Sequence, residues 1–295
     1  MQNYVLTTCS TVDISAEHLK LRNIDFIKFS FFIDGVEYKD DIGQSLEYDK
    51  FYQMMADGAD TKTSQPNADE YVEFFKPYLE NGKDIIHLNL SSGLSGSMTS
   101  AKIAAEELEN QYPGRKIYIV DSLGASSGMA VLVDEMADRR DSGMSIDDLY
   151  KWTEENKLNV HHWFFTSDLT YFVRGGRVSK VAGWFGSILK ICPLLNVDNN
   201  GKLIKREKIR KKENVIKAIV KKMEEFAFDG INYNGRCYIS NAACYDDASA
   251  VKDLIEATFP NMKDKVIINN IGTTIGSHTG PGTVALFFLG QKREN

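Results

Sequence analysis

The sequence predicts an α/β protein with a parallel sheet in a first domain and a mixed or antiparallel sheet in a second α/β domain. Its first half repeats a strand, a polar loop and a helix, the unit that builds parallel sheets covered by helices. Its second half contains short strands joined by turn signals, such as Asp198–Gly201, that favour antiparallel neighbours. Single cores usually split at roughly 250–300 residues. Because the chain has 295 residues, we expect domains at 1–160 and 161–295.

The elements of the first half follow from the spacing of apolar residues. Phe26–Ile33 reads as one strand, and the Asp34-Gly35 pair after it is a strong hairpin signal. Thr61–Asn67 is a polar stretch that leads into a helix. In chain order we expect a strand at Asn3–Thr8, a helix at Ala16–Lys20, strands at Phe26–Ile33 and Val36–Lys39, helices at Tyr48–Ala56 and Ala68–Glu80, a strand from Ile85 to Leu90, a helix at Met98–Leu108, a strand at Lys116–Val120, and helices at Met129–Arg140 and Ile146–Leu158.

The second half is read in the same way. Pro193 is expected to stop a helix, and Gly272–Gly282 is expected to be a loop because glycine and proline interrupt regular structure. In chain order we expect a strand at His161–Thr166, a helix at Phe185–Cys192, strands at Leu194–Val197 and Lys202–Lys208, a helix at Asn214–Phe226, a strand at Arg236–Ala242, a helix at Asp246–Phe259, and strands at Lys265–Asn270 and Val284–Phe288.

Composition and charge argue against several classes of function. The formal charge of −6 is unlike that of a general nucleic-acid binder, which normally carries a basic surface. The four cysteines form no CxxC pair and do not cluster with histidine, so we expect free thiols and no metal site. The N-terminal residues lack the pattern of a signal peptide, and no apolar run approaches the roughly 20 residues of a membrane span. We therefore expect a cytoplasmic protein without stable membrane insertion.

A turn of small residues follows the strand that ends at Leu90. It reads SSGLSGS at Ser91–Ser97 and leaves N–H groups and hydroxyls at a helix N-terminus, where the helix dipole favours an anion. Serine and glycine are also good turn and cap residues. The turn alone therefore supports an anion site and a purely structural role about equally. A second small-residue loop, Ser122–Gly128, is expected at the same edge of the sheet.

His278 stands in the segment IGSHTGPGT, beside Thr279. A histidine flanked by hydroxyls among glycine and proline is poorly placed for a core. We therefore favour a functional role, either as a donor to a carboxylate or as a general base beside a serine.

Two arginines, Arg174 and Arg177, flank a Gly-Gly pair. They either clamp an anion or lie in a solvated surface turn, and the residues do not decide between these roles. The chain lacks the GxxxxGK phosphate loop and the GxSxG nucleophile elbow. Both absences favour a ligand-binding role for the serines over a catalytic one.

Six motifs occur in a fixed order along nearly the whole chain. They are TSQP at Thr63–Pro66, SSGLSGS at Ser91–Ser97, VDS with following small residues at Val120–Gly128, RGGRVS at Arg174–Ser179, Pro-Leu-Leu at Pro193–Leu195 and GSHTGPG at Gly276–Gly282. Each motif is weak alone, but the combination is highly specific. It resembles the DegV family of bacterial lipid-binding proteins.

The resemblance implies a flavodoxin-like first domain, a mixed-sheet second domain and one long-chain fatty acid bound between or beneath them. It also implies a non-catalytic carrier with no cofactor, which presents the fatty-acid carboxylate to a separate ATP-binding subunit of fatty acid kinase for acyl-phosphate formation. By similarity, Thr63, one of Ser91 and Ser92, and His278 form the carboxylate site. The full expected ligand-binding set is Thr63, Ser91, Ser92, Ser95, Arg177, His278 and Thr279.

The sequence departs from the family pattern after its first strand. The family usually has an acidic TDS-like motif there, whereas this chain has Thr8-Cys9-Ser10. The loss of that carboxylate puts a role of the N-terminal loop in head-group organisation or subunit contact in doubt.

Two further hypotheses come from the residues. A basic segment, Lys202–Lys222, stands out in an acidic protein, and we expect Arg206 or Arg210 to help dock an acidic partner such as the kinase subunit. The alternative function is a stand-alone serine-dependent acyl hydrolase or transferase that uses Ser92 or Ser95 with His278.

Overall fold

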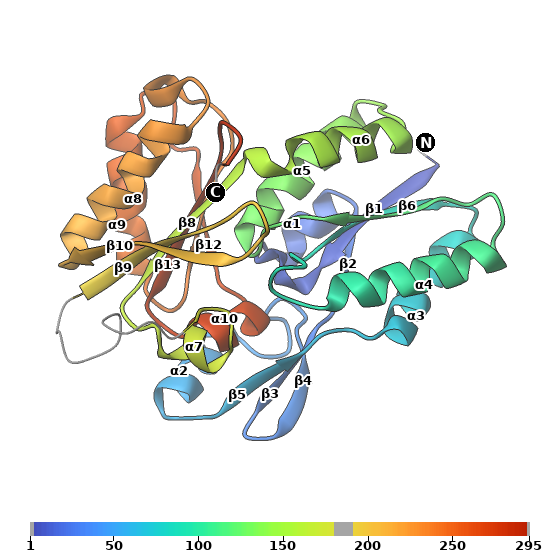
Figure 1. The fold of residues 1–295 in the computed structure, drawn as a ribbon, viewed down its shortest axis with the longest axis horizontal. Coiled ribbons are helices and arrows are strands. Elements are labelled where there is room, and N and C mark those ends of the chain that lie inside the picture. Colours follow the sequence, from blue (N-terminus) through green and yellow to red (C-terminus); the bar gives the residue numbers. More distant parts are fainter. Residues whose placement is uncertain (1–2, 180–190, 294–295) are drawn as a thin grey trace.

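The computed structural model describes residues 3–179 and 191–293 and contains three β-sheets (Figure 1). The first sheet is wholly parallel, with strand order β2-β1-β6-β7. Its strands are β1 (Tyr4–Cys9), β2 (Ile24–Ile27), β6 (Asp84–Asn89) and β7 (Ile117–Asp121). The helices of this half are α1 (Ala16–Leu21), α3 (Ala68–Glu80), α4 (Ser97–Gln111), α5 (Ser127–Asp141) and α6 (Ile146–Asn156), with short 3-10 turns η1 (Ser10–Val12) and η2 (Lys157–Asn159). The parallel α/β class predicted for this half is confirmed.

A small antiparallel sheet, β4-β3-β5, corrects two predictions. It consists of β3 (Ser30–Ile33), β4 (Val36–Lys39) and β5 (Thr61–Ser64), and α2 (Tyr48–Ala56) lies between β4 and β5 in the chain. The expected single strand Phe26–Ile33 is two strands in different sheets, because the Phe29 N–H donates to Ser10 Oγ (3.1 Å) instead of continuing a ladder. The polar stretch Thr61–Asn67 begins with a strand, because Thr61–Ser64 pairs with β3.

The third sheet is mixed, with strand order β10-β9-β8-β13-β11-β12. Only β11 and β12 are parallel neighbours, so the predicted mixed sheet is confirmed. The strands are β8 (Val160–Thr166), β9 (Ile191–Val197), β10 (Leu203–Arg210), β11 (Cys237–Asn241), β12 (Val266–Asn270) and β13 (Thr283–Leu289). The helices are α7 (Thr170–Arg174), α8 (Lys212–Phe226), α9 (Tyr245–Thr258) and α10 (Thr273–Thr279), with the 3-10 turn η3 (Gly230–Asn232).

Two predictions in this half are wrong at the residues that the structure describes. Gly272–Gly282 is not a loop throughout, because it contains helix α10. The expected helix Phe185–Cys192 falls mostly on residues 180–190, outside the described residues, but Ile191 and Cys192 open strand β9. Pro193 is tolerated in that strand because β8 pairs only with the residues that follow it, Leu194–Asn196.

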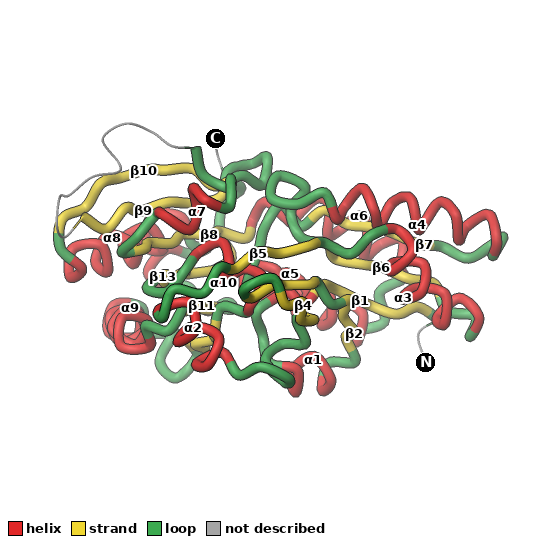
Figure 2. Tube along the Cα trace, turned by 90° about the horizontal axis from the view of Figure 1, so that it is seen from below, coloured by secondary structure: helices red, strands yellow, loops and turns green. Residues whose placement is uncertain are grey.

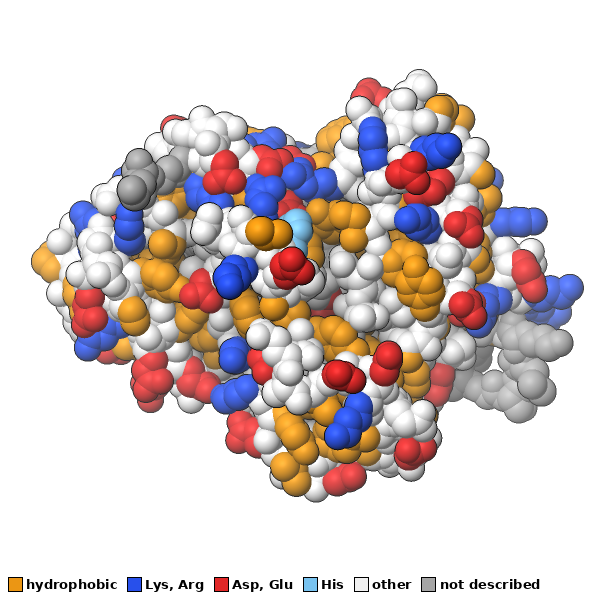
Figure 3. All heavy atoms as spheres, turned by 180° about the vertical axis from the view of Figure 1, so that it is seen from behind, with side chains coloured by type: hydrophobic (Ala, Val, Ile, Leu, Met, Phe, Trp, Pro, Cys, Tyr) orange, Lys and Arg blue, Asp and Glu red, His pale blue; other side chains and the backbone are white. Residues whose placement is uncertain are grey.

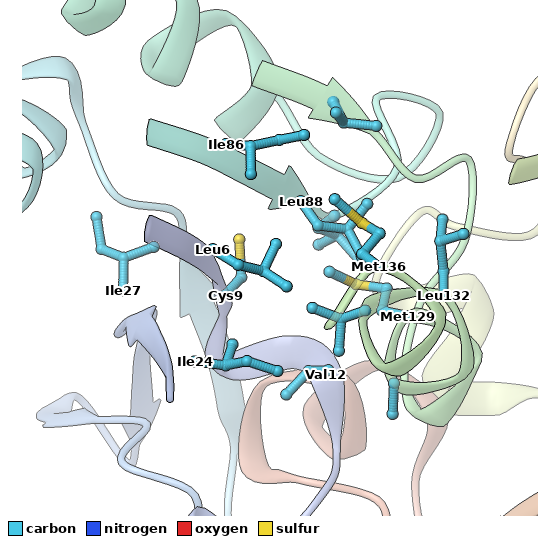
Figure 4. Packing of buried hydrophobic residues seen from close by; sticks show 14 of the residues in the cluster. Leu6, Cys9, Val12, Ile24, Ile27, Ile86, Leu88, Met129, Leu132 and Met136 are labelled. Atoms are coloured by element: carbon cyan, nitrogen blue, oxygen red, sulfur yellow. The ribbon is translucent and has the colours of Figure 1, made fainter. Parts of the chain in front are cut away.

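The alternation of side chains along β8 sends its residues to two different layers. Trp163 and Phe165 join the hydrophobic cluster under α8 and α9, whereas Phe164 joins the cluster that contains α5. Helix α5 contacts β8, β11 and β13 of the mixed sheet. Its side chains also meet those of β1 and β6 from the parallel sheet, as Leu6, Leu88, Met129 and Met136 show (Figure 4).

One continuous hydrophobic cluster thus reaches from the parallel sheet to the mixed sheet, and the domain boundary at residue 160 stays a prediction. Seen from below, β5 lies close to α10 (Figure 2), and the contacts between these two elements agree. Lysine, arginine, aspartate and glutamate side chains are interspersed on the face shown in Figure 3. Within residues 3–179 and 191–293, no helix combines the length and apolar character that crossing a membrane requires.

Candidate functional site

A cavity of about 300 Å³ lies where residues of all three sheets and of their connecting loops converge. This volume is at the lower end of the range of about 300–1,000 Å³ that is common for small-molecule sites. The walls are mostly apolar and come from both halves of the chain; among them are Phe29, Leu94, Phe164, Phe172, Ile275 and Phe287. The cavity is therefore suited to an apolar ligand body.

Polar side chains gather at one part of this wall. Thr63 and Gln65 come from β5 and its end, Ser95 from the loop before α4, and His278 and Thr279 from the last turn of α10. Thr63 Oγ1 lies 2.7 Å from His278 Nε2, which is a hydrogen-bonding distance. The structure thus joins two of the sequence-predicted residues directly, although 215 positions separate them.

Helix α10 is held at its first turn by two buried carboxylates. Asp40 Oδ2 accepts hydrogen bonds from Thr274 N (3.2 Å) and Thr274 Oγ1 (2.6 Å). Asp13 Oδ1 accepts one from Gly272 N (2.9 Å). These acceptors satisfy N–H groups that have no partner within a helix, and they place the last turn with His278 over the cavity.

His278 is a neutral imidazole in this environment. Burial lowers its pKa to about 4, and the positive charges of Arg177 and Arg174 add to the effect. Its Nδ1 atom is buried without a hydrogen-bond partner. Gly175 packs against this edge of the ring, where a Cβ atom would lie 2.4 Å from Nδ1. A glycine is therefore needed at this contact.

Arg177 brings a positive charge to the cavity wall. Its Nε donates to the Leu94 carbonyl oxygen at 3.2 Å, and its Nη1 donates to the carbonyl oxygen of Gly175. Burial lowers the pKa of Arg177 from its usual value, but a guanidinium stays charged in proteins. Arg174 is not in the wall; its guanidinium lies 3.6 Å from Asp60 and donates to Thr61 Oγ1. Of the two arginines, only Arg177 is positioned to meet a ligand.

The three candidate serines have different surroundings. Ser91 is fully buried, and its hydroxyl donates to the carbonyl oxygen of Gly201 at 2.9 Å. Ser92 is exposed and, like Ser91, does not line the cavity. Ser95 lines the cavity and donates to Gln65 Oε1 at 3.1 Å. The expectation that Ser91 or Ser92 forms the carboxylate site is therefore not supported by the geometry, which favours Ser95.

The site holds neither a catalytic nor a metal-binding arrangement among the residues that the structure describes. None of the three serines is hydrogen-bonded to a histidine there, because Ser95 bonds Gln65 and His278 bonds Thr63. Within the same ranges, no three His, Cys, Asp or Glu side chains gather closely enough to hold a metal ion.

Comparison with known proteins places the chain in a family. Residues 4–291 match the sequence model described as "uncharacterised protein, DegV family". The chain belongs to the DegV family. It is 37% identical over 295 residues to a DegV domain-containing protein of Clostridium perfringens, and the match covers 100% of both chains.

Solved structures of the DegV family have the same fold. A DegV lipid-binding protein from Thermotoga maritima matches with a TM-score of 0.84 and 27% identity over 100% of both chains. DegV of Bacillus subtilis, described as a fatty acid binding protein, matches with a TM-score of 0.81 and 26% identity, covering 99% of this chain and 100% of that one.

Other residues singled out in this DegV-family chain lie away from the cavity. Arg206 and Arg210 are exposed on the edge strand β10, where Arg206 Nε donates to Asn196 Oδ1 at 2.8 Å. Cys9, at the position where the family usually has an acidic residue, is fully buried and is absent from the cavity wall. All four cysteines are free.

Sequence reasoning assigned no role to two residues of the wall. Gln65 belongs to the TSQP motif, and that motif was the only available signal for it. His162 also lines the cavity, although a histidine inside an apolar strand reads as a core residue.

Proposed function

We propose that this chain binds one long-chain fatty acid, with the carboxylate at the polar part of the cavity and the tail against the apolar walls. The observation that carries the proposal is the cavity itself, whose apolar body ends at Arg177 and the Thr63–His278 pair. The DegV relatives named above as lipid-binding and fatty-acid-binding support it.

A carboxylate suits the polar groups because each oxygen accepts several hydrogen bonds. His278 Nε2–H donating to Thr63 Oγ1 would leave the threonine hydroxyl proton for the ligand. Ser95 and Thr279 add two hydroxyls in the same wall, and the Thr279 hydroxyl is buried without a partner. Arg177 supplies the charge that compensates the carboxylate. In this arrangement the protein needs no nucleophile of its own.

The tail supplies most of the affinity. Burying one methylene group stabilises a complex by about 0.8 kcal/mol, so a long acyl chain outweighs any single hydrogen bond to the head group. Affinity therefore depends on the apolar walls, whereas the head-group residues fix which way round the fatty acid lies.

We further propose that the bound carboxylate is presented to a separate ATP-binding fatty acid kinase subunit. In that step a carboxylate oxygen attacks the γ-phosphorus of ATP, the bond to the β-phosphate oxygen breaks, and an acyl phosphate and ADP form. Exposed Arg206 and Arg210 on β10 are the candidate docking residues. We place the protein in the cytoplasm, where its four free cysteines would stay reduced.

Lipid analysis tests the binding proposal. Protein purified from bacterial cells should release a fatty acid on organic extraction, measured by mass spectrometry, and delipidated protein should take up added fatty acid. Thr63→Val should weaken uptake, because it removes the hydroxyl and keeps the shape. Thr61→Val is the matched control, since Thr61 is on the same strand but outside the cavity wall. A lipid-free protein that takes up no fatty acid would refute the proposal.

A further inference from the structure

The cavity stops at a definite point along the mixed sheet. On β13 the residues Thr283, Ala285 and Phe287 line it, and on β8 Phe164 and His162 line it. The next residues on the same face, Leu289 and Val160, are absent from the wall. His162 and Phe287 are register partners, and their rings meet edge to face with centroids 5.3 Å apart. This pair closes the cavity.

The closed end lies away from the head-group residues. Thr283 marks the other end of β13, where its hydroxyl donates to the carbonyl oxygen of Thr279, the neighbour of His278. From Thr283 to Phe287 the strand advances four residues, which is about 13 Å at roughly 3.3 Å per residue. A fatty acid anchored beside His278 would therefore point its terminal methyl group towards His162.

The imidazole of His162 is held so that it cannot retreat. Its Nδ1–H donates to the Val160 carbonyl oxygen at 3.0 Å, which leaves Nε2 unprotonated. Behind the ring stand Gly124 and Gly128, where a Cβ atom would lie 2.3 and 2.1 Å from Nε2. Both glycines are required to seat the ring, and Nε2 has no hydrogen-bond partner.

We propose that His162 is the residue that limits acyl-chain length in this protein, with Gly124 and Gly128 as its seat. The proposal rests on the proposed fatty-acid binding and deepens it. A large ring fixed at the closed end stops the chain, whereas the other walls only accompany it.

Two substitutions should change the length preference in opposite directions. His162→Ala removes the ring and lengthens the cavity, so the best-bound saturated fatty acid should be longer by at least two carbons. Gly124→Ala introduces a methyl group whose contacts within 4 Å are all with His162, so it should push the ring forward and favour a shorter chain. The double variant His162→Ala with Gly124→Ala should lose the shortening, because the ring that transmits it is gone.

The experiment offers each purified, delipidated variant a mixture of straight-chain saturated fatty acids that differ by two carbons and identifies the bound species by mass spectrometry. Thermal unfolding confirms that each variant is folded, and Gly124→Ala remains informative if His162→Ala does not fold. An unchanged length profile in a folded variant that binds fatty acid overturns the inference alone. Failure of the wild-type protein to bind any member overturns the proposed function instead.

Discussion

Three serines in one loop allow the head-group assignment to be tested by the same substitution at three positions. Ser95→Ala should weaken fatty-acid binding, because only Ser95 lines the cavity. Its hydroxyl donates to the neutral amide oxygen of Gln65 and would turn to a charged carboxylate on binding. Hydrogen bonds to charged groups contribute about 1.5–3 kcal/mol and neutral ones about 0.5–1.5 kcal/mol. The expected loss is therefore about 1–2 kcal/mol, or roughly five- to thirtyfold in the dissociation constant.

The other two serines serve as matched controls with different expected results. Ser92→Ala should leave both binding and stability unchanged, since Ser92 is exposed and outside the wall. Ser91→Ala should lower the free energy of unfolding by about 1–3 kcal/mol, because it removes the buried donor to the Gly201 carbonyl oxygen. Displacement of a fluorescent fatty acid measures binding, and urea unfolding measures stability. If Ser92→Ala weakened binding as much as Ser95→Ala, the assignment would be refuted.

Three more predictions concern pH, helix position and docking. The pKa of His278 is about 4 in the folded protein and about 6.5 when unfolded, so the unfolded state binds more protons in between and stability falls as pH drops through this window. Between neutral pH and about pH 5, the wild type should lose roughly 1–2 kcal/mol more free energy of unfolding than His278→Gln, and equal losses would contradict the cited pKa. Asp40→Ala should cost about 1–3 kcal/mol in urea unfolding and also weaken fatty-acid binding, because Asp40 holds the start of α10; intact binding would show that α10 needs no such anchor. Charge reversal of Arg206 and Arg210 should reduce phosphoryl transfer by a purified kinase subunit without changing fatty-acid binding, whereas Lys102→Glu on α4 should change neither, and a parallel fall in both properties would make the arginines structural.

Local sequence patterns predicted those elements whose stability is local. Helices at Tyr48–Ala56 and Ala68–Glu80 have the predicted bounds, because the apolar spacing of each marks a face that packs on the core. Strand β5 was missed, since Thr61–Ser64 is polar and becomes a strand only by pairing with β3.

Helix α10 was missed for a related reason. Gly276 lowers its intrinsic helix propensity, yet a Cβ atom there would lie 2.5 Å from Tyr52 Oη, so close packing requires the glycine. The N–H groups of its first turn are satisfied by Asp13 and Asp40, which come from the other half of the chain.

The site could be predicted as a set of motifs but not as a geometry. Thr63 and His278 were named from separate motifs, and no spacing rule predicts that their side chains meet at 2.7 Å. The choice among the serines depends on long-range packing as well. Ser91 is taken by the carbonyl oxygen of Gly201, which is 110 positions away, and this leaves Ser95 for the cavity.

The same distinction explains what the departure at Cys9 changes. The Cys9 sulfur lies 3.6 Å from His87 Nε2 and 3.3 Å from Asn89 Oδ1. Burial raises the pKa of Cys9 to about 12 and lowers that of His87 to about 3, so both groups are neutral. An ionised carboxylate at this position would have to share a fully buried site with an uncharged imidazole, which is costly, whereas a thiol requires no charge there.

A carboxylate from the same N-terminal segment nevertheless reaches the site. Asp13 accepts hydrogen bonds from Gly272 N, just before α10, and from the hydroxyl of Ser126, which lines the cavity. It therefore ties the segment after β1 both to the helix that carries His278 and to the cavity wall. The loss of an acidic residue at position 9 thus leaves the connection between this segment and the head-group site in place, because that connection runs through Asp13 and not through Cys9.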